Sequence, residues 1–455
     1  MSKSSRQSDS SEPPSGSKQL DLALQEFYDN HQIDISRFLE NSSETKDRSP
    51  FLYRFVRLNP RYDRQETLQE LTKELDDTHQ PIRVTWLPDD DFYAIPSNFQ
   101  LSSSPCFQSG RIYGMDVSSG AAVSVLLHDT HNQTTPSDPT SGKSKSERNA
   151  VRVLDLCCCP GLKLCAIADK VPPGSTVVGV DISEQRMALC RKIIQKYQIE
   201  TTRGPDDSSP PNVKIQLYCQ DGTTFGTAAV DQYLIFDSRV AWEEETNKGS
   251  RKRKNKSSRA RERKRLKQMA AMEMFPKAST ASGEGSSSSN EANASTDQNE
   301  PGQQKSPLHL FDYVLVDAEC STDGSIKHLK ERLKESTGTT VPNNQLLTDK
   351  DQLAELVHLQ RRLLASGFRL LRRGGTLVYS TCSLSRDQNE EVVQWLLDNH
   401  SDAQVIPVAF SLSDKDQLVR EGSVHGTVRF SPNLGRDKDT LLGDGFFLAK
   451  IGKQT

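Results

Sequence analysis

The sequence predicts an α/β fold with a parallel sheet, and three observations in residues 151–382 support this prediction. Short, almost wholly apolar segments such as VRVLDL and STVVGVD recur along the chain and are bounded by turn residues. Segments with apolar residues at spacings of three and four lie between them. The first kind has the length of a buried strand, whereas the second has the period of an amphipathic helix. Strands and helices that alternate in this way form a parallel sheet covered on both faces.

Ahead of this region the chain predicts a smaller α/β unit. Residues 1–50 predict a disordered tail followed by a short helix over about 18–45, because the tail is polar and lacks apolar residues. From Phe51 onward FLYRFVRLN predicts a strand, and DRQETLQELTKEL predicts a helix with an Asp63–Glu66 capping box. IRVTWLP and FYAIPS predict two further strands. We therefore assign residues 51–128 to an N-terminal unit, and the polar residues 129–149 to a linker.

The elements of the large domain, residues 150–453, follow in order. VRVLDL predicts its first strand and LKLCAIADK its first helix. STVVGVD predicts the second strand, followed by the helix SEQRMALCRKIIQKY, which Ser183 can cap. VKIQLYCQD and FDYVLVDAEC predict the third and fourth strands. A long helix is predicted over residues 349–373, ending at Gly374-Gly375, and TLVYSTCS predicts the fifth strand.

Residues of about 240–306 interrupt this rhythm between the third and fourth strands. They contain RKRKNKSSRARERKRLK and then a stretch rich in Ser, Asn and Gly, so they cannot bury enough apolar surface to fold. The basic run, residues 251–267, has a balance of +10, so the rest of the chain carries −13 against a total of −3. We expect a disordered insertion whose basic run is a nuclear address, a nucleic-acid arm or a solvated helix.

Composition narrows the class of protein. The chain has 455 residues with nine cysteines in no regular spacing, which does not predict a disulfide framework. Its N-terminus is polar and carries acids, so it resembles neither a signal peptide nor a transit peptide. No apolar run approaches the roughly 20 residues that a membrane span needs. We expect a soluble, reduced, intracellular monomer without a membrane partner.

The loop after the first strand of the large domain predicts the class of ligand. Ligands of open parallel sheets bind beyond the carboxyl ends of the strands. DLCCCPGLKLC lacks the three-glycine fingerprint of a dinucleotide site, and its single Pro-Gly turn suits a smaller, cationic ligand without phosphates. Asp181, at the end of the second strand, is placed for ribose hydroxyls, and Asp221, after the third, for an adenine amine. The alternative that each acid caps the following helix stays open.

The same loop predicts no metal site, although it is rich in cysteine. Consecutive residues in extended chain point to opposite faces, so at most two of Cys157, Cys158 and Cys159 could face one ion. The next cysteines are Cys165 and Cys190, the latter in the middle of a helix, and the loop has no histidine. Tetrahedral zinc needs four convergent ligands.

Several motifs together resemble the Nol/Nop/Sun family of RNA (cytosine-C5) methyltransferases, over about residues 51–128 and 150–453. DLCCCPGLK is similar to the family's cofactor loop, Asp-x-Cys-Ala-Ala-Pro-Gly-Gly-Lys, and VDAECSTDG to its Asp-Ala-Pro-Cys motif. GGTLVYSTCSLSRDQNEEVV is similar to its Thr-Cys-Ser motif followed by Asn-Glu. RFVRLNP resembles the start of its N-terminal RNA-binding unit, and RFSPNL…GDGFFLAK its C-terminal hairpin. The cysteines at the ends of the fourth and fifth strands are the most specific of these signals.

The resemblance implies a Rossmann-like methyltransferase sheet that binds S-adenosylmethionine. The cofactor would lie along Asp181, Asp221 and the cofactor loop, with Asp317 close to its methyl end. The residues that the resemblance assigns to the loop are Cys157, Cys158, Cys159, Pro160, Gly161, Leu162 and Lys163. Cys158 and Cys159 replace two alanines of the family, and Glu319 stands where the family has proline.

The resemblance also implies roles for three residues at the strand ends. Cys382 would be the nucleophile, Cys320 the second cysteine that helps to release product, and Asp317 the acid that holds the base. A thiolate that adds at C6 of cytosine makes C5 nucleophilic enough to accept a methyl group. Cys382 must then be partly ionised, which a helix start with a Ser385–Gln388 capping box would favour. Taken alone, Cys382 would be better explained as a core-filling residue, and it is the pair with Cys320 that favours a catalytic role.

The resemblance implies that the partner is RNA, either tRNA or rRNA. A base stacked in a helix is out of reach of the site, so the target base must be presented from a loop or flipped out. Tyr53, Arg54 and Arg57 lie in a segment that interleaves aromatic and cationic side chains, as a single-strand platform would. The alternative is that alternate side chains form the core face of a strand. A second function on the same fold is an RNA-binding or ribosome-assembly factor with an impaired site. We expect nuclear or nucleolar localisation, otherwise cytoplasmic.

Overall fold

The structure is a computed structural model that describes most of the chain outside its polar segments. The described residues are 53–76, 79–88, 91–128, 150–197, 212–227, 233–241, 310–325, 328, 349–408, 410, 419–432 and 443–455. The tail, the helix predicted at 18–45, the linker and the basic run lie outside them. The chain divides into two compact units, residues 1–239 with 310–455, and residues 240–309. Nearly all of the second unit lies outside the described residues, so the fold below is that of the first.

A small antiparallel sheet forms the N-terminal part, in the strand order β2-β3-β1-β4. Helix α3 begins at the predicted N-cap, since the Asp63 carboxylate accepts from the backbone amide of Glu66. Leu71 and Leu75 of this helix region are buried against the sheet, with Leu68 beside them. The elements are β1 (Tyr53–Leu58), α3 (Arg64–Glu74), β2 (Ile82–Arg83), β3 (Phe92–Pro96), a 3-10 turn (Leu101–Ser103), α4 (Pro105–Gln108) and β4 (Ile112–Gly114).

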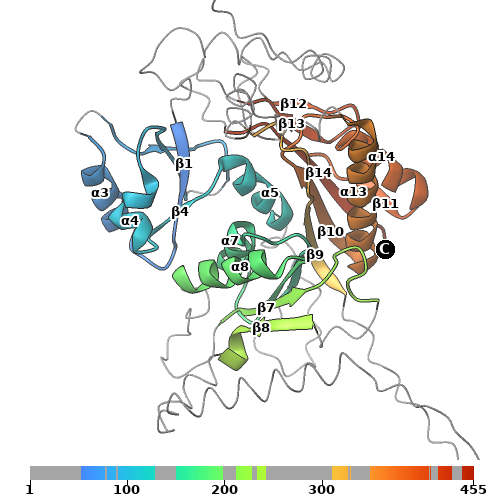
Figure 1. Cartoon of the computed structure of the whole chain (residues 1–455), viewed down its shortest axis with the longest axis horizontal. Helices are drawn as coiled ribbons and strands as arrows, with labels where there is room; N and C mark the ends of the chain where they lie inside the picture. The colour runs from blue at the N-terminus through green and yellow to red at the C-terminus, as the bar shows by residue number, and fades with distance from the viewer. Residues whose placement is uncertain are drawn as a thin grey trace, which may run out of the picture. The chain divides into compact units, whose positions relative to one another are not determined.

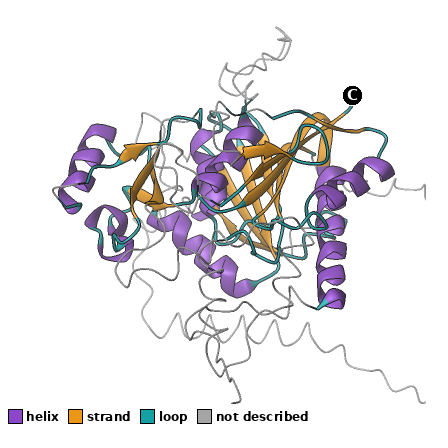
Figure 2. Ribbon diagram, turned by 90° about the horizontal axis from the view of Figure 1, so that it is seen from above, coloured by secondary structure: helices purple, strands orange, loops and turns teal. Residues whose placement is uncertain are grey.

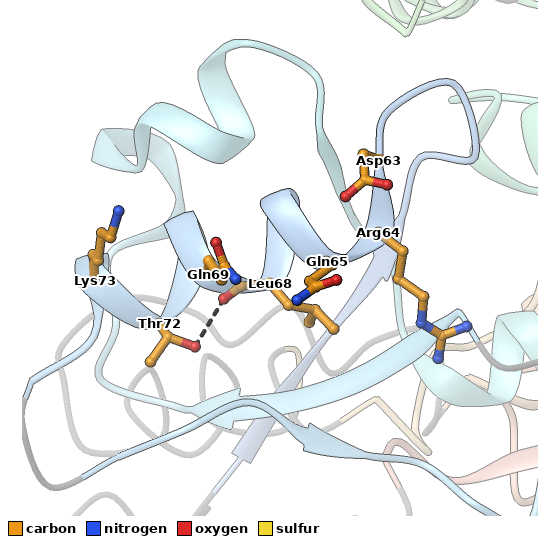
Figure 3. A pocket seen from close by; sticks show the side chains of 7 residues that line it. All are labelled: Asp63, Arg64, Gln65, Leu68, Gln69, Thr72 and Lys73. Carbon is orange, nitrogen blue, oxygen red and sulfur yellow. Dashed lines mark hydrogen bonds between the residues drawn. The ribbon is translucent and has the colours of Figure 1, made fainter.

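A shallow hollow of about 690 Å³ runs along helix α3 (Figure 3). All seven residues that line it come from this one helix and its N-cap, among them Arg64 and Lys73. The Thr72 hydroxyl inside it donates to the Leu68 carbonyl, 2.8 Å away, within the helix. No nucleophilic and basic groups from separate elements meet there, so the hollow is a surface groove of the helix and not a candidate active site.

The large sheet is mixed, with the strand order β12-β13-β14-β10-β9-β5-β6-β7-β8, and β11 pairs with β14. The pairs among β10, β9, β5, β6 and β7 are parallel, as predicted. The strands outside them pair antiparallel, so the prediction of a wholly parallel sheet is corrected at both edges. Its strands are β5 (Arg152–Asp155), β6 (Thr176–Asp181), β7 (Lys214–Cys219), β8 (Leu234–Asp237), β9 (Phe311–Asp317), β10 (Leu371–Thr381), β11 (Ala403–Val405), β12 (Val419–Glu421), β13 (Val428–Phe430) and β14 (Phe446–Lys453).

Helices cover both faces of this sheet, as the sequence predicts (Figures 1 and 2). Helices α5 (Val117–Leu127), α7 (Leu162–Lys170) and α8 (Glu184–Lys196) lie on one face. Helices α13 (Lys350–Leu370) and α14 (Glu390–Asn399) lie on the other. Helix α5 falls in the range assigned to the N-terminal unit, yet it packs on α7, β9, β10 and β14. Its near-complete burial explains this placement, since an apolar helix must be covered on all sides.

Two helix boundaries differ from the prediction. Helix α13 ends at Leu370, and Gly374 and Gly375 lie inside β10, where the register with β9 shifts. Helix α14 begins at Glu390 with Asn389 as its N-cap, so the predicted capping box of Ser385 and Gln388 is wrong. Gln388 is fully buried, and its side chain hydrogen-bonds to Ser321 instead of to a helix end.

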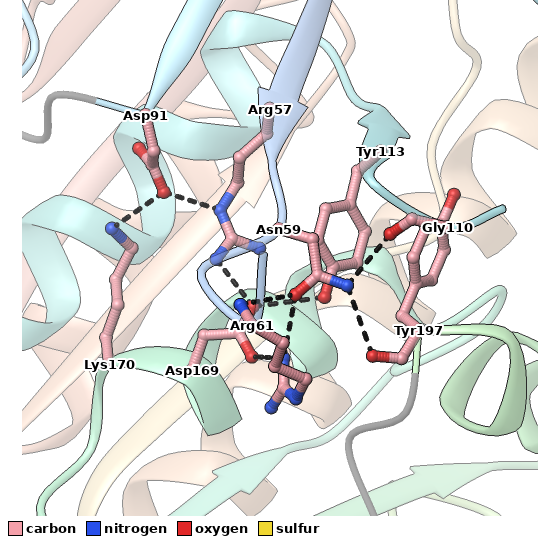
Figure 4. Close-up of polar contacts among 9 residues, drawn as sticks. All are labelled: Arg57, Asn59, Arg61, Asp91, Gly110, Tyr113, Asp169, Lys170 and Tyr197. Atoms are coloured by element: carbon pink, nitrogen blue, oxygen red, sulfur yellow. Dashed lines mark hydrogen bonds and ion pairs between the residues drawn. The ribbon is translucent and has the colours of Figure 1, made fainter. Parts of the chain in front are cut away.

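A buried ion network joins the small sheet to helix α7 (Figure 4). The guanidinium of Arg57 pairs with Asp91 at 2.7 Å and with Asp169 of α7 at 2.6 Å, and Arg61 pairs with Asp169 at 2.5 Å. The Asn59 amide donates to the carbonyl of Gly110, 2.8 Å away. Arg57 and Asp169 are each 1% exposed. The prediction that Arg57 contacts RNA is therefore corrected: its charge is paired and covered, and it docks the small sheet.

Candidate active site at the carboxyl ends of β5, β9 and β10

The strand order reverses between β5 and β9, because the chain proceeds from β5 toward β7 on one side and continues as β9 and β10 on the other. Ligands of such sheets bind at this reversal, beyond the carboxyl ends of the strands. Asp155 ends β5, Asp317 ends β9, and Cys382 directly follows β10. The topology thus gathers at one edge the side chains that the sequence places at three separate strand ends.

The two cysteines of the predicted pair lie in contact. The Sγ atoms of Cys320 and Cys382 are 3.1 Å apart, a hydrogen-bonding distance for thiols. Cys320 is 9% exposed and comes from the loop after β9, whereas Cys382 is half-buried and comes from the neighbouring loop. Parallel pairing that sets Ser380 beside Asp317 brings both loops to the same level.

Hydrogen bonds between the two loops hold the thiols in place. Gln388 accepts from the backbone amide of Ser321 at 3.0 Å and donates to its hydroxyl at 2.7 Å. The Gly324 amide donates to the Cys382 carbonyl at 2.9 Å. Gln360 of α13 donates to the carbonyl of Glu319 at 2.8 Å, while the Glu319 side chain is exposed. The turn that has Glu319 in place of the family's proline is therefore fastened by its neighbours.

A charged pair lies beside the thiols. The Lys163 ammonium is 2.7 Å from Oδ2 of Asp317, whose Oδ1 accepts from the Ser380 hydroxyl at 2.8 Å. The hydrogen bond with Cys320, together with burial and the charge of Asp317, raises the pKa of Cys382 well above its ordinary value, and Lys163 opposes this rise. The prediction that a nearby helix start lowers this pKa is wrong, since α14 begins eight residues later and the two thiols hydrogen-bond to each other.

A cavity of about 140 Å³ lies next to this pair and is lined by the whole predicted cofactor loop. Gly161 has φ of +111° at the N-cap of α7, a left-handed conformation that favours glycine and turns the chain sharply into the helix. The cavity's lining comprises Gly114, Met115, Asp116, Ser119, Asp155, Cys157, Cys158, Cys159, Pro160, Gly161, Leu162, Lys163 and Asp317.

Asp155 tests whether this cavity fits the predicted cofactor. The residue is 1% exposed, and neither carboxylate oxygen has a hydrogen-bond partner among the described residues. Burial, and then the charge of Asp317, raise the pKa of this carboxyl well above its ordinary value. An unpaired buried acid in a cavity is costly unless a donor or a cation meets it. The residues present therefore fit a ligand that carries positive charge, as S-adenosylmethionine does.

The sequence analysis missed Asp155 and the α5 side of the cavity. Asp155 ends an apolar strand before a glycine-containing loop, the same signal that singled out Asp181, and could have been found by it. Met115, Asp116 and Ser119 lie far from the loop in sequence, and only the packing of α5 on the large sheet brings them there.

The two strand-end acids assigned to the cofactor's nucleoside lie beside the cavity lining rather than in it. Asp181 is 5% exposed, and its Oδ1 accepts from the amide of Ser183 at 3.0 Å. Oδ1 of Asp221 accepts from the amide of Thr223 at 2.8 Å. Each acid thus accepts a local hydrogen bond from the amide two residues later, but neither caps a helix, since Ser183 is the N-cap of α8 and no helix lies between β7 and β8 among the described residues. Their contacts with ribose and adenine stay predictions.

The cofactor loop also meets Cys190, contrary to the expectation from the sequence. The Sγ atoms of Cys158, Cys159 and Cys190 all lie within 4.8 Å of one another, and all three residues are buried. Hydrogen bonds from Cys158 and Cys159 lower the pKa of Cys190 to about 5. The sequence places Cys190 in the middle of a helix and apart from the loop, but α8 packs directly against the loop and brings this thiol to it.

Tyr53 and Arg54, the other residues predicted to contact RNA, are half-buried in β1. The Arg54 guanidinium donates to the carbonyl of Phe99 at 2.9 Å. RNA contact by these two residues stays a prediction.

Within the part of the chain that the structure describes, none of the helices combines the length and apolarity required to cross a membrane.

Comparison with known proteins finds similarity over the C-terminal part of the chain. Residues 287–452 match the family model described as 16S rRNA methyltransferase RsmB/F. The ribosomal RNA small subunit methyltransferase F of Salmonella heidelberg (strain SL476) is 39% identical over 148 residues, which are 32% of this chain and 26% of that protein. The protein of the same name from Klebsiella pneumoniae (strain 342) is 38% identical over 145 residues, 31% of this chain and 26% of its own length. The matched region thus spans about a quarter of these relatives.

Solved structures agree in fold. NSun6 from Pyrococcus horikoshii, in complex with SFG, an analogue of S-adenosylmethionine, has a TM-score of 0.54 at 14% identity, over 97% of this chain and 98% of that chain. A methyltransferase homologue from the same organism has a TM-score of 0.51 at 19% identity, with 96% of each chain covered. The sheet therefore has the Rossmann-like fold of these methyltransferases, as the sequence predicts. Over residues 287–452 the chain is thus similar to the RsmB/F methyltransferases, in agreement with the Nol/Nop/Sun resemblance of its sequence motifs.

Proposed function

We propose that the chain methylates C5 of a cytosine in RNA, through a covalent bond between Sγ of Cys382 and C6 of the base. The observation that carries the proposal is the pair of thiols 3.1 Å apart, beside Asp317 at the edge of the cofactor cavity. A methyltransferase acting on a protein or a small molecule has no use for two cysteines at adjacent strand ends. The name of the curated relatives supports rRNA as the class of RNA.

S-adenosylmethionine, when bound, supplies the methyl group as a sulfonium electrophile. Cys382 provides the nucleophile: its thiolate forms an S–C6 bond, and the electron pair of the C5=C6 double bond becomes available at C5. After C5 has gained the methyl group, its proton leaves to a base, the double bond re-forms and the S–C6 bond breaks. The sulfur of Cys382 departs as the thiolate, so the enzyme returns to its starting state.

Cys320 is placed to serve the second half of this sequence. Its sulfur lies within hydrogen-bonding distance of Cys382, so it can accept or relay the C5 proton, directly or through water. Asp317 would meet the N3–N4 edge of the base and offset the charge that develops when C6 is attacked. Lys163 holds the Asp317 carboxylate in place and is the nearest cation to oppose the raised pKa of Cys382.

The two cysteines should fail in different ways when each is changed to alanine. Cys382→Ala removes the S–C6 bond, so no covalent protein–RNA adduct should form under any condition. Cys320→Ala still attacks and methylates but resolves the adduct slowly, so a complex that survives denaturing gels should accumulate. The measurement is a denaturing gel of each variant incubated with labelled RNA and S-adenosylmethionine.

Two outcomes would contradict this assignment. An adduct trapped by Cys382→Ala would mean that the roles of nucleophile and release residue are reversed. If both variants lost only stability and no adduct appeared with either, the thiols would be core residues. The chain would then be an RNA-binding or assembly factor, an alternative that the raised pKa of Cys382 favours. Single-turnover methylation by the unmodified chain separates these two functions directly.

A further inference from the structure

We infer that Cys158, Cys159 and Cys190, together with Met187, form a binding site for a soft, thiophilic metal ion, Cu(I), behind the cofactor loop. The site is separate from the thiol pair of the proposed reaction and draws on two different elements. Cys158 and Cys159 belong to the loop between β5 and α7, whereas Met187 and Cys190 lie one turn apart on helix α8.

The spacing of the sulfur atoms suits a single ion. Each pair among the three Sγ atoms is no more than 4.8 Å apart. An ion held at about 2.3 Å from three thiolates in a plane requires sulfur–sulfur separations of about 4.0 Å. The cluster therefore needs side-chain shifts of less than about an ångström to close on a metal, a range that rotation about χ1 supplies.

The chemistry of the donors selects the kind of ion. The Met187 thioether lies 3.3 Å from Sγ of Cys159 and 3.8 Å from Sγ of Cys158, and it is fully buried. The cluster of three candidate ligands contains no carboxylate and no imidazole. Thiolate and thioether sulfur prefer Cu(I), while a tetrahedral zinc site would need a fourth cysteine, histidine or acid. Binding would displace the thiol protons to solvent, so the site need not hold three buried negative charges without an ion.

The surroundings confine the site. Cys158, Cys159 and Cys190 are 4%, 7% and 0% exposed. A Cβ at Gly161 would lie 2.7 Å from Sγ of Cys190, so the loop rests directly on this sulfur. The Arg186 guanidinium, also on α8, donates to the carbonyl of Cys159 at 2.8 Å and holds the loop against the helix. Such a buried, pre-assembled sulfur cluster loses little conformational entropy when an ion binds.

The test is an anaerobic titration with Cu(I), with bathocuproine disulfonate as the competing chelator. Because the thiols of Cys320 and Cys382 could also bind Cu(I), the titrated protein should be the full chain with both changed to alanine. We expect one Cu(I) per chain at an affinity that withdraws the ion from the chelator. Cys190→Ser should weaken this binding at least 100-fold, and X-ray absorption of the bound ion should show sulfur neighbours alone.

A second variant keeps the test decisive if Cys190→Ser does not fold. Cys158→Ala with Cys159→Ala introduces the residues that the family carries in this loop, so it should fold, and it should also abolish tight binding. Cys165→Ala is the matched control, since Cys165 is equally buried on α7 but outside the cluster. The inference is wrong if the titrated protein binds no Cu(I), or if the control variant loses binding to the same extent as the cluster variants.

Discussion

At the scale of single residues, the environment of Cys382 favours the neutral, unreactive thiol. Its hydrogen bond with Cys320, burial and the charge of Asp317 all favour the protonated form and raise its pKa, whereas the Lys163 ammonium opposes this rise. A neutral thiol resists oxidation and alkylation, because the thiolate is the reactive species. The same contacts therefore keep Cys382 protonated, and the proposed attack on C6 requires that they rearrange.

Changing Cys320 should make Cys382 more reactive at neutral pH. Cys320→Ala removes the hydrogen bond that raises the pKa of Cys382 most, so a larger fraction of Cys382 is thiolate at pH 7. Peptide mass spectrometry of iodoacetamide labelling, resolved by site, measures this rate against pH. Lys163→Gln should have the opposite effect. It removes the cation that lowers the pKa of Cys382, so the labelling profile should shift to higher pH. Equal rates in all three proteins would show that the thiol pair is not coupled.

Asp155 should link cofactor affinity to pH-dependent stability. Its folded-state pKa is raised, so the folded chain holds a proton that the unfolded chain releases above about pH 4. The stability that this group contributes is present below that value and is lost as pH rises toward the folded pKa. Asp155→Asn should therefore gain free energy of unfolding relative to the parent between pH 4 and 7, and bind S-adenosylmethionine more weakly. Urea unfolding and calorimetry check the two effects, and a loss of stability across this range would contradict the assignment.

At the scale of elements, the motif RFVRLNP has a structural task that its resemblance to an RNA-binding unit does not convey. Strand β1 delivers Arg57 into the interface with helix α7, and the following Asn59 bonds to the carbonyls of Gly110 and Tyr197. The Asp169 carboxylate forms ion pairs with both Arg57 and Arg61. Helix α7 starts at the cofactor loop and ends at this network, so the interface also sets the position of that loop.

Removing one charged partner from this buried network should lower the free energy of unfolding substantially. Asp169→Asn leaves the buried guanidinium of Arg57 with one carboxylate, Asp91, and should lower the free energy of unfolding by about 3–5 kcal/mol. Denaturant unfolding gives this value. Glu66→Gln is the matched control, because its pair with Arg111 is exposed and should contribute at most about 1 kcal/mol. Equal effects of the two substitutions would mean that the interface network is not a determinant of stability.

At the scale of the whole molecule, the chain divides into two units, and residues 240–309 form a different unit from the one that carries Cys320 and Cys382. The basic run 251–267 lies in that separate part, and the sequence leaves its role open between an address and a nucleic-acid arm. Its position between β8 and β9 puts it on a connection that leaves the strands of the methyltransferase sheet uninterrupted.

Deleting residues 251–267 should change where the protein is located in the cell and leave its methylation activity nearly unchanged. We propose that the run is a nuclear or nucleolar address, because its charge is dense and lies outside the folded unit. A fluorescent fusion without the run should redistribute to the cytoplasm, while methylation of naked RNA in vitro should stay within about twofold of the full chain. If activity collapses and localisation does not change, the run is an RNA-binding arm.

The sequence by itself determined the elements and their chemistry where the signal is local. Apolar length and helical period predict β5, β6, β7 and α8, and short-range hydrogen bonds at Asp63 and Ser183 begin helices where the sequence predicts them. The two cysteines could be assigned to one site because parallel strands bring their carboxyl ends to one edge.

Only the tertiary structure decided the features that depend on contacts between distant residues. Arg57 is covered because Asp169, 112 residues away, meets it across an interface. Gln388 and Ser385 do not cap a helix, since Gln388 is recruited by Ser321 of the neighbouring loop. The antiparallel edges of the sheet, the burial of α5 and the meeting of Cys190 with Cys158 and Cys159 arise in the same way. The physical reason is that burial and charge pairing depend on which surfaces the fold brings together, and a local sequence pattern does not contain that information.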